Sequence, residues 1–230
     1  MTSRGKLYGV SVGPGDPELL TLKAVRLIKE ADIIAAPNIG HKRQTALNIV
    51  REYIGDKELM DCSTPMLRDR AQVERAYDEL ADRLAAVLDQ GKTVSYICLG
   101  DIGVYATYYY LHNRLVERGY DCEVIAGVTS FSAAAAALGV PLCLGPERLE
   151  VIPVIKDGVD NILATPGTKV FMKTGKELPQ LKEALRSAGC LDRASMVANC
   201  GLEDEQVFSR LADVPEDMTD YFTLVILRES

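Results

Sequence analysis

The sequence has few residues of the kinds that build metal centres and disulfide frameworks. Only two histidines, His41 and His112, occur in 230 residues. The six cysteines are scattered, and no two of them form a C-x-x-C pair. These absences exclude a structural zinc site and a disulfide scaffold. We therefore expect no bound metal and thiols that stay reduced.

The chain also lacks internal repeats, low-complexity tracts and an apolar N-terminal run of the length that a signal peptide requires. A cytoplasmic setting is therefore expected. Residues 124–146 carry no charge, but glycines and prolines interrupt this segment. That pattern favours a strand, a loop and a short helix over a membrane-spanning helix.

An excess of basic residues is absent as well, since the formal net charge is −7. This balance excludes a protein that binds nucleic acid phosphates over a broad surface. Hydrophobic residues make up 47% of the chain and charged residues 26%, which is an ordinary globular composition. An acidic ligand would need a local basic pocket.

The N-terminal part of the chain predicts a strand, a tight turn and a helix. Leu7–Val12 is the strand, and Gly13–Gly15 with its central proline is the turn. Asp16 followed by Pro17 is typical of a helix N-cap with proline at the first helical position. The glycines do not have the G-x-G-x-x-G spacing of a dinucleotide site, so we expect a different ligand.

Strand and helix patterns alternate along the whole chain. The predicted strands are Leu7–Val12, Asp32–Ala36, Thr93–Cys98, Cys122–Ala126, Leu149–Ile155, Lys169–Lys173, Ala194–Asn199 and Tyr221–Leu227. The predicted helices are Pro17–Glu30, Gln44–Tyr53, Asp69–Gln90, Tyr105–Arg118, Ser130–Leu138 and Leu178–Ala188. This alternation indicates an α/β protein with mainly parallel sheets and helices on their faces.

Two features indicate two domains. Eight strands exceed the usual size of a single sheet, and Glu117–Asp121 is a polar joint near the middle of the chain. We predict an N-terminal α/β domain over 1–118 and a C-terminal one over 119–230. Ligands of such proteins bind beyond the carboxyl ends of strands. The loops of interest follow Val12, Cys98, Ala126, Lys173 and Asn199.

The loops after the third and fourth predicted strands have unusual compositions. In Leu99–Leu111, glycines let the backbone approach a ligand, and Asp101 is placed to cap the next helix. In Gly127–Leu142, Thr129 and Ser130 open an alanine-rich helix that is narrow enough to pack tightly.

Four stretches carry a resemblance to a known family. They are residues 13–24, 64–69, 100–111 and 127–142. In this order they resemble the tetrapyrrole methylases, the S-adenosylmethionine enzymes of corrin and siroheme synthesis. Residues 64–69, the Thr107-Tyr108 continuation and the Phe131-Ser132 pair resemble the branch that methylates C-20 of precorrin-2 or cobalt-factor II. The likeness covers nearly the whole chain.

Two residues depart from the family pattern. Ile102 stands where the family usually has proline after Gly-Asp, and Ala106 stands where this branch often has serine. We expect Ile102 to loosen the loop.

The resemblance implies a two-domain class III methyltransferase fold, with S-adenosyl-L-methionine in a cleft between the domains. It implies C-20 methylation of a small-molecule tetrapyrrole in cobalamin biosynthesis, by a cytoplasmic homodimer that binds neither nucleic acid nor membrane. Another ring methyltransferase of the family is the alternative, and so is a relative that modifies a histidine side chain. Without the resemblance, a nucleotide-sensing module would also fit.

The family's cofactor positions fall on Pro14, Leu99, Gly100, Asp101, Val104, Thr129, Ser130, Met172, Cys200, Tyr221 and Thr223. The acceptor would carry eight carboxylates, so cations should gather near it. The candidates are Lys42, Arg43, Arg68 and Arg70, each of which could equally be a solvated surface charge. Tyr105 and Tyr108 could stack on the macrocycle or pack in the core. No catalytic residue is assigned, although these two hydroxyls are candidates for a base.

Overall fold

The computed structural model describes residues 4–37, 44–64, 69–153, 158–218 and 220–229. The chain divides into two compact units, Met1–Thr129 and Ser130–Ser230. Each unit has its own five-stranded sheet with helices on both faces, as the two-domain α/β prediction requires.

The first sheet is parallel throughout and has the strand order β3-β2-β4-β1-β5. Its strands are β1 (Lys6–Ser11), β2 (Ile33–Ala36), β3 (Glu58–Asp61), β4 (Val94–Cys98) and β5 (Asp121–Ile125). Because the three strands β4, β1 and β5 are neighbours, the loops that leave their carboxyl ends start side by side.

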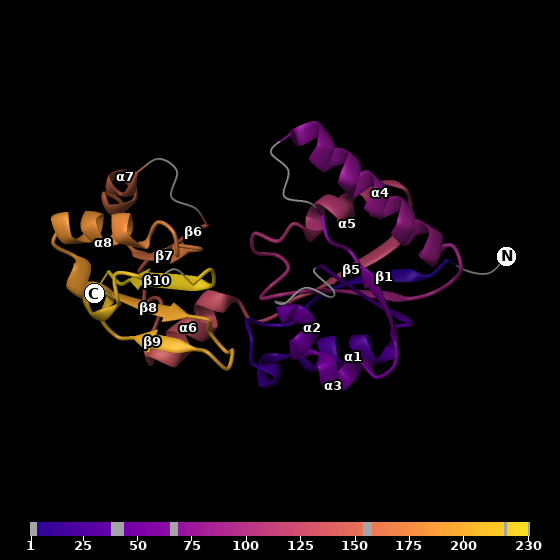
Figure 1. Ribbon diagram of the computed structural model, residues 1–230, viewed down its shortest axis with the longest axis horizontal. Helices are drawn as coiled ribbons and strands as arrows, with labels where there is room; N and C mark the ends of the chain where they lie inside the picture. Colours follow the sequence, from indigo (N-terminus) through magenta and orange to yellow (C-terminus); the bar gives the residue numbers. More distant parts are fainter. Residues whose placement is uncertain (1–3, 38–43, 65–68, 154–157, 219, 230) are drawn as a thin grey trace. The chain divides into compact units, whose positions relative to one another are not determined.

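Helices cover both faces of the first sheet, as Figure 1 shows. One face carries α4 (Arg70–Leu88) and α5 (Tyr108–Glu117), and the other carries α1 (Leu22–Glu30), α2 (Thr45–Ile49) and α3 (Arg51–Ile54). The predicted helix over Asp69–Gln90 corresponds to α4, whose buried residues form one apolar stripe: Tyr77, Leu80, Ala81, Leu84 and Leu88.

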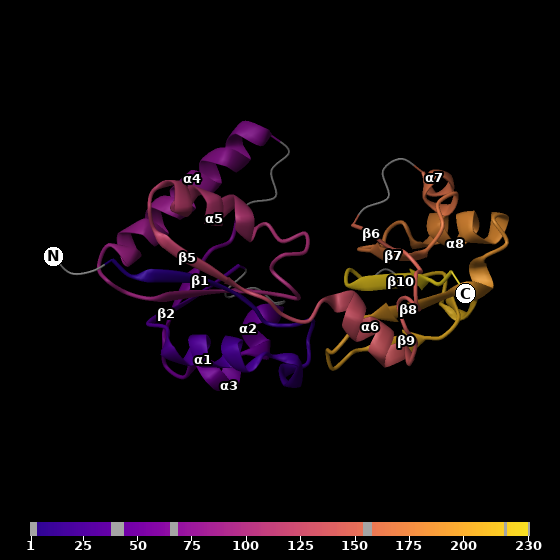
Figure 2. The same cartoon turned by 180° about the vertical axis from the view of Figure 1, so that it is seen from behind.

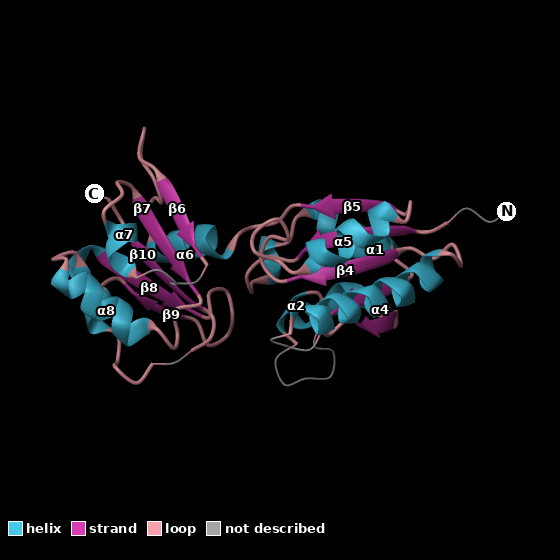
Figure 3. Cartoon of the chain, turned by 90° about the horizontal axis from the view of Figure 1, so that it is seen from above, coloured by secondary structure: helices cyan, strands magenta, loops and turns pink. Residues whose placement is uncertain are grey.

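The second sheet has the order β6-β7-β10-β8-β9, which Figure 3 shows from above. Its strands are β6 (Leu149–Ile152), β7 (Thr168–Met172), β8 (Ala194–Ala198), β9 (Gln206–Phe208) and β10 (Thr223–Leu227). Only β6 and β7 pair in parallel among the strands described, whereas β10 is antiparallel to both β7 and β8. The prediction of mainly parallel sheets is therefore wrong for this unit.

The helices of the second unit are α6 (Ser130–Leu138), α7 (Val159–Leu163) and α8 (Leu178–Ser187). Helices α7 and α8 share one apolar cluster with the sheet, and α6 contacts β8, β9 and β10. Figure 2 shows α6 lying against the sheet. Its alanines at 133–135 are buried, as the prediction of a narrow helix requires.

The sequence prediction divides the chain after residue 118, but the first compact unit extends to Thr129. The reason is that Asp121–Ile125 forms β5, which pairs along its length with β1. A segment that supplies an edge strand to a sheet belongs to that sheet's core, whatever the composition of the joint before it.

The predicted helix over Pro17–Glu30 is divided. Pro17–Leu19 is a 3-10 turn capped by Asp16, whose Oδ1 accepts from the Glu18 amide at 2.8 Å. Helix α1 then starts after Thr21, whose Oγ1 accepts from the Ala24 amide at 3.1 Å.

Across the ranges described, no helix is both long and apolar enough to cross a membrane.

Candidate cofactor and acceptor site

The first two candidate loops are hydrogen-bonded to each other beyond the ends of β1 and β4. The Gly100 amide donates to the Gly13 carbonyl at 2.7 Å, and the Gly13 amide donates back at 3.2 Å. Both glycines have a φ of +74°, a conformation that glycine adopts without the penalty of a Cβ. Two of the loops that the sequence singles out therefore meet within the first unit.

Asp101 joins the second loop to the third. Its Oδ2 accepts from the Gly127 amide at 2.6 Å, and its Oδ1 accepts from the Gly103 amide at 2.8 Å. Helix α5 begins only at Tyr108, so the expectation that Asp101 caps this helix is wrong. The carboxylate instead fixes the positions of two loops.

Ser11, the last residue of β1, connects the second loop to the end of β5, from which the third loop leaves. The sequence analysis did not identify this residue. Its Oγ donates to the Ile125 carbonyl at 2.7 Å and accepts from the Ile102 amide at 2.8 Å. A Cβ added to Gly127 would lie 2.4 Å from the Ser11 Cβ, so only glycine fits at 127. The sequence signal that could have identified Ser11 is a hydroxyl residue at the last position of an otherwise apolar strand.

Ile102 tightens the second loop, so the expectation that it loosens the loop is wrong. Its side chain is fully buried in the core between the first sheet and helices α4 and α5. Its amide supplies the hydrogen bond to Ser11, which a proline at this position would lack.

Replacing Ser11 with alanine should destabilise the first unit by about 2 kcal/mol, because a buried amide and a buried carbonyl both lose their partner. Ser95→Ala is the matched control, since Ser95 is equally buried but its hydroxyl forms one hydrogen bond among the described residues, to the Leu27 carbonyl at 3.1 Å. Urea unfolding should rank S11A as the less stable variant. Equal losses would contradict the bridging role.

The space above Gly100 is open. Apart from its chain neighbours, no described residue has a heavy atom within 4 Å of a Cβ added here, although the loop's backbone is fixed on both sides. Around it, Pro14 is buried, and Leu99 and Val104 are half-buried. This is the kind of surface on which backbone groups can approach a ligand closely.

Thr129 and Ser130 lie at the end of the third loop. Both are half-buried, and Ser130 is the first residue of α6. The loop that leads to them is fixed by the Asp101 bond to Gly127.

The cofactor positions predicted in the second unit gather at one edge of its sheet. Met172 ends β7 and Thr223 starts β10, while Cys200 follows β8. The Thr223 carbonyl accepts from the Lys173 amide at 3.1 Å, and the two hydroxyls of Thr174 and Thr223 are 2.9 Å apart. Tyr221 is 53% exposed just before β10, and Thr223 is buried.

Asn199 organises this edge and was also missed in the sequence. Its backbone has a φ of +52°, its side chain is 1% exposed, and its Nδ2 donates to Asp204 Oδ2 at 3.0 Å and Asp220 Oδ1 at 3.2 Å. The amide thus ties the loop after β8 to the segment before β10. Its Oδ1 is buried, and none of the residues that the structure describes donates a hydrogen bond to it.

The Cys200 thiol is unsuited to act as a nucleophile. Burial, with Glu205 nearby, raises the pKa of this thiol to about 12.

Within the parts of the chain that the structure describes, no group of three or more histidine, cysteine, aspartate or glutamate side chains could hold a metal ion.

Tyr108 does not stack on a ligand, because its side chain is 1% exposed in the core. The ring lies against Gly9, where an added Cβ would be 2.5 Å from its atoms, and burial raises the pKa of the hydroxyl. The prediction that Tyr108 binds the acceptor is wrong. Tyr105, which precedes α5, is 50% exposed and has a φ of +52°.

His112 should give the protein a measurable pH dependence. Its Nδ1 is 3.3 Å from the Tyr108 hydroxyl, and burial lowers its pKa below 6.5. As the pH falls, the His112 imidazole is therefore protonated in the unfolded chain before it is protonated in the folded protein. The free energy of unfolding consequently decreases as the pH falls below about 6.5. Urea midpoints should fall more for the wild type than for H112Q between pH 7 and 5.5. Parallel curves would contradict this.

The predicted acceptor cations are only partly placed. Lys42, Arg43 and Arg68 lie outside the described residues. Arg70 is exposed at the first position of α4, directly after Asp69, whose side chain caps that helix.

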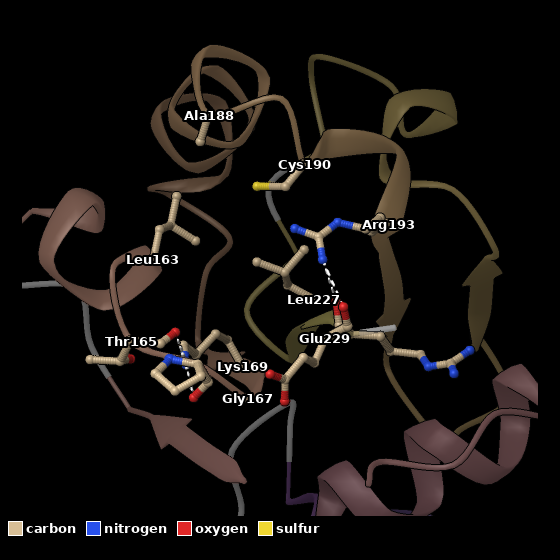
Figure 4. A pocket seen from close by; sticks show the side chains of 11 residues that line it. Leu163, Thr165, Gly167, Lys169, Ala188, Cys190, Arg193, Leu227 and Glu229 are labelled. Atoms are coloured by element: carbon tan, nitrogen blue, oxygen red, sulfur yellow. Dashed lines mark hydrogen bonds between the residues drawn. The ribbon is translucent and has the colours of Figure 1, made fainter. Parts of the chain in front are cut away.

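A pocket of about 220 Å³ lies at the opposite edge of the second sheet, where β7 and β8 begin (Figure 4). Two of the three cations that line it are engaged internally. Lys169 donates to the carbonyls of Thr165 and Pro166, and Arg193 donates to the carbonyl of Glu229 at 2.9 Å. None of the predicted site residues lines this pocket, so it is separate from the candidate site.

Comparison with known proteins gives a consistent picture. A family model described as Tetrapyrrole (Corrin/Porphyrin) Methylases matches residues 6–215. The cobalt-precorrin-2 C(20)-methyltransferase of Salmonella typhimurium is 35% identical over 98% of this chain and 97% of its own length. The CobIJ protein of Mycobacterium tuberculosis is 34% identical over 99% of this chain, which spans only 46% of that relative.

A solved structure has the same fold. Uroporphyrin-III C-methyltransferase from Thermus thermophilus matches with 26% identity and a TM-score of 0.70, covering 98% of this chain and 93% of that one. A second structure of it, complexed with S-adenyl homocysteine, matches with a TM-score of 0.66, 24% identity and 98% coverage of both chains.

Proposed function

Because the chain belongs to the tetrapyrrole (corrin/porphyrin) methylases, we propose that it methylates C-20 of a reduced tetrapyrrole, either precorrin-2 or its cobalt-containing counterpart. The methyl donor is S-adenosylmethionine. The observation that carries this proposal is the 35% identity, over almost the full length of both chains, to a cobalt-precorrin-2 C(20)-methyltransferase. CobIJ, of which this chain spans about half, is a cobalamin biosynthesis protein by name.

The residues present fit such a donor. The left-handed Gly100 leaves an unfilled space beside a backbone that Gly13, Ser11 and Asp101 hold in place. Leu99 and Val104 offer half-buried apolar contacts next to it. Pro14, Thr129 and Ser130 complete the proposed set in the three loops. In the second unit, we assign Met172, Cys200, Thr223 and Tyr221 to the same ligand.

When bound, S-adenosylmethionine supplies a methyl group on a positively charged sulfur. The protein's own contribution is alignment, which is worth about 7–11 kcal/mol in well-oriented reactions. Asp101 and Ser11 act as positioning residues, because their bonds hold the loops rather than a ligand. No base is assigned, although the exposed Tyr105 hydroxyl is better placed than that of Tyr108 to meet an acceptor.

The proposal is tested by incubating the purified protein with S-adenosylmethionine and precorrin-2, with and without cobalt. Mass spectrometry should detect one added methyl group, and NMR should place it at C-20. Methylation at another ring carbon would favour a different ring methyltransferase of the family. Donor binding with no transfer to either acceptor would overturn the proposal and favour a sensing module.

We also propose that the protein is a homodimer and works in the cytoplasm. The free thiols of all six cysteines support a reducing compartment. Analytical ultracentrifugation at micromolar concentration tests the dimer, and a single sedimenting species of 25.1 kDa would contradict it.

A further inference from the structure

Lys173 has a backbone conformation that its side chain makes costly. Its φ is +57°, and eleven of the fourteen described residues with positive φ are glycines. A residue with a Cβ pays on the order of 1–2 kcal/mol in this conformation. A glycine at this position would avoid that penalty, so the lysine side chain offers something that offsets it.

The location of Lys173 indicates which role of its side chain offsets the conformational penalty. The residue follows Met172 directly, and its amide donates to the Thr223 carbonyl at 3.1 Å, which fixes its backbone at the edge of β7 and β10. Met172 and Thr223 are both proposed donor-binding residues. The ammonium group therefore extends from the edge at which the donor is proposed to bind.

The ammonium group is also uncommitted. Lys173 is exposed, and none of the described residues forms an ion pair or a hydrogen bond with its side chain. Two other lysines of this unit are engaged, since Lys169 pairs with Glu150 and Lys182 pairs with Glu216. An exposed, strained and unpaired lysine contributes little to folding, so its use lies with a ligand.

We propose that Lys173 is a specificity-determining residue that forms an ion pair with a carboxylate of the tetrapyrrole acceptor. This inference rests on the proposed function, because that acceptor carries eight carboxylates and must contact the donor's methyl group. A lysine suits this task, since its long flexible stem lets one charge follow a mobile carboxylate arm. The other carboxylate that could form an ion pair with Lys173 is that of the amino-acid part of the donor.

Three substitutions separate charge from backbone strain. Lys173→Met removes the charge and keeps the strain, Lys173→Gly removes both, and Lys173→Arg keeps both. Lys176→Met is the matched control, because Lys176 is exposed in the same loop with no ion pair among the described residues and no positive φ.

We expect K173M and K173G each to raise the KM for the acceptor about tenfold, the loss of one charge-assisted bond, with kcat unchanged. K173R and K176M should stay near the wild type. The wild-type KM should rise with ionic strength more steeply than that of K173M. K173G alone should raise the melting temperature, because it removes the strain.

Calorimetry of acceptor binding in the absence of donor measures the contribution of the same ion pair, even if no methyl group is transferred. Failure of the proposed function can therefore be distinguished from failure of this inference. Unchanged acceptor affinity in K173M would overturn the proposal. A weaker affinity for S-adenosylmethionine with unchanged acceptor affinity would assign Lys173 to the donor's carboxylate and overturn it as well.

Discussion

Replacing Gly100 with leucine should reduce the affinity for S-adenosylmethionine at least a hundredfold while the protein still unfolds cooperatively. Among the described residues, no heavy atom beyond the chain neighbours lies within 4 Å of a Cβ added at Gly100, so the leucine side chain starts into open space. It would occupy the space proposed for the donor. The folded state would lose about 1–2 kcal/mol, since leucine is unfavourable at a φ of +74°.

Gly119→Leu is the matched control for this substitution. Gly119 has a φ of +80° and an equally open Cβ direction, but it follows α5 at the opposite end of the first sheet. Both variants should lose similar stability in urea, and only G100L should lose donor binding in calorimetry. Wild-type affinity in G100L would remove the second loop from the proposed site.

Replacing Asn199 with aspartate should cost about 3 kcal/mol or more of stability at pH 7. The amide nitrogen donates to two carboxylates, Asp204 and Asp220, from a position that is 1% exposed. A third carboxylate there would face both at hydrogen-bond distance. Like charges at about 4 Å repel by on the order of 4 kcal/mol near a protein surface.

The cost of this substitution should disappear on acidification. Repulsion would raise the folded-state pKa of the new carboxyl above the unfolded value of about 3.9. The penalty is therefore complete above the folded-state pKa and absent below the unfolded one, because the protonated acid again has a hydrogen to donate.

Asn199→Gly is the control, because glycine accepts the φ of +52° and removes the amide without adding charge. Its smaller loss, about 1–2 kcal/mol for the two hydrogen bonds, should not recover between pH 7 and 4. Urea unfolding at the two pH values checks both variants. An N199D protein as stable as the wild type at pH 7 would show that Asn199 does not hold this edge together.

Much of the fold and part of the site were predictable from local patterns. The 3.6-residue stripe of α4 and the apolar runs of β1, β4 and β8 correspond to elements of the structure. The turn 13–15 and the Gly-Asp pair at 100–101 are local glycine signals, and they mark loops that meet. Such features depend on neighbours in the chain, so the sequence carries them directly.

Short edge elements were not predictable in the same way. The strands Glu58–Asp61 and Gln206–Phe208 and the helix Val159–Leu163 have weak patterns of their own. The two strands owe their form to backbone pairing with β2 and β8. A partner distant in sequence leaves no periodic signal in the segment that it stabilises.

By itself, the sequence determined the α/β class, the two-unit organisation, the family and the loops that matter, because these follow from periodicity, strand number and glycine placement. Only the tertiary structure decided that β10 is antiparallel, that Tyr108 is core, and that Ser11, Asn199 and Lys173 hold or flank the proposed site. The direction in which a side chain points, and which distant backbone group it meets, depends on the packing of elements far apart in the chain.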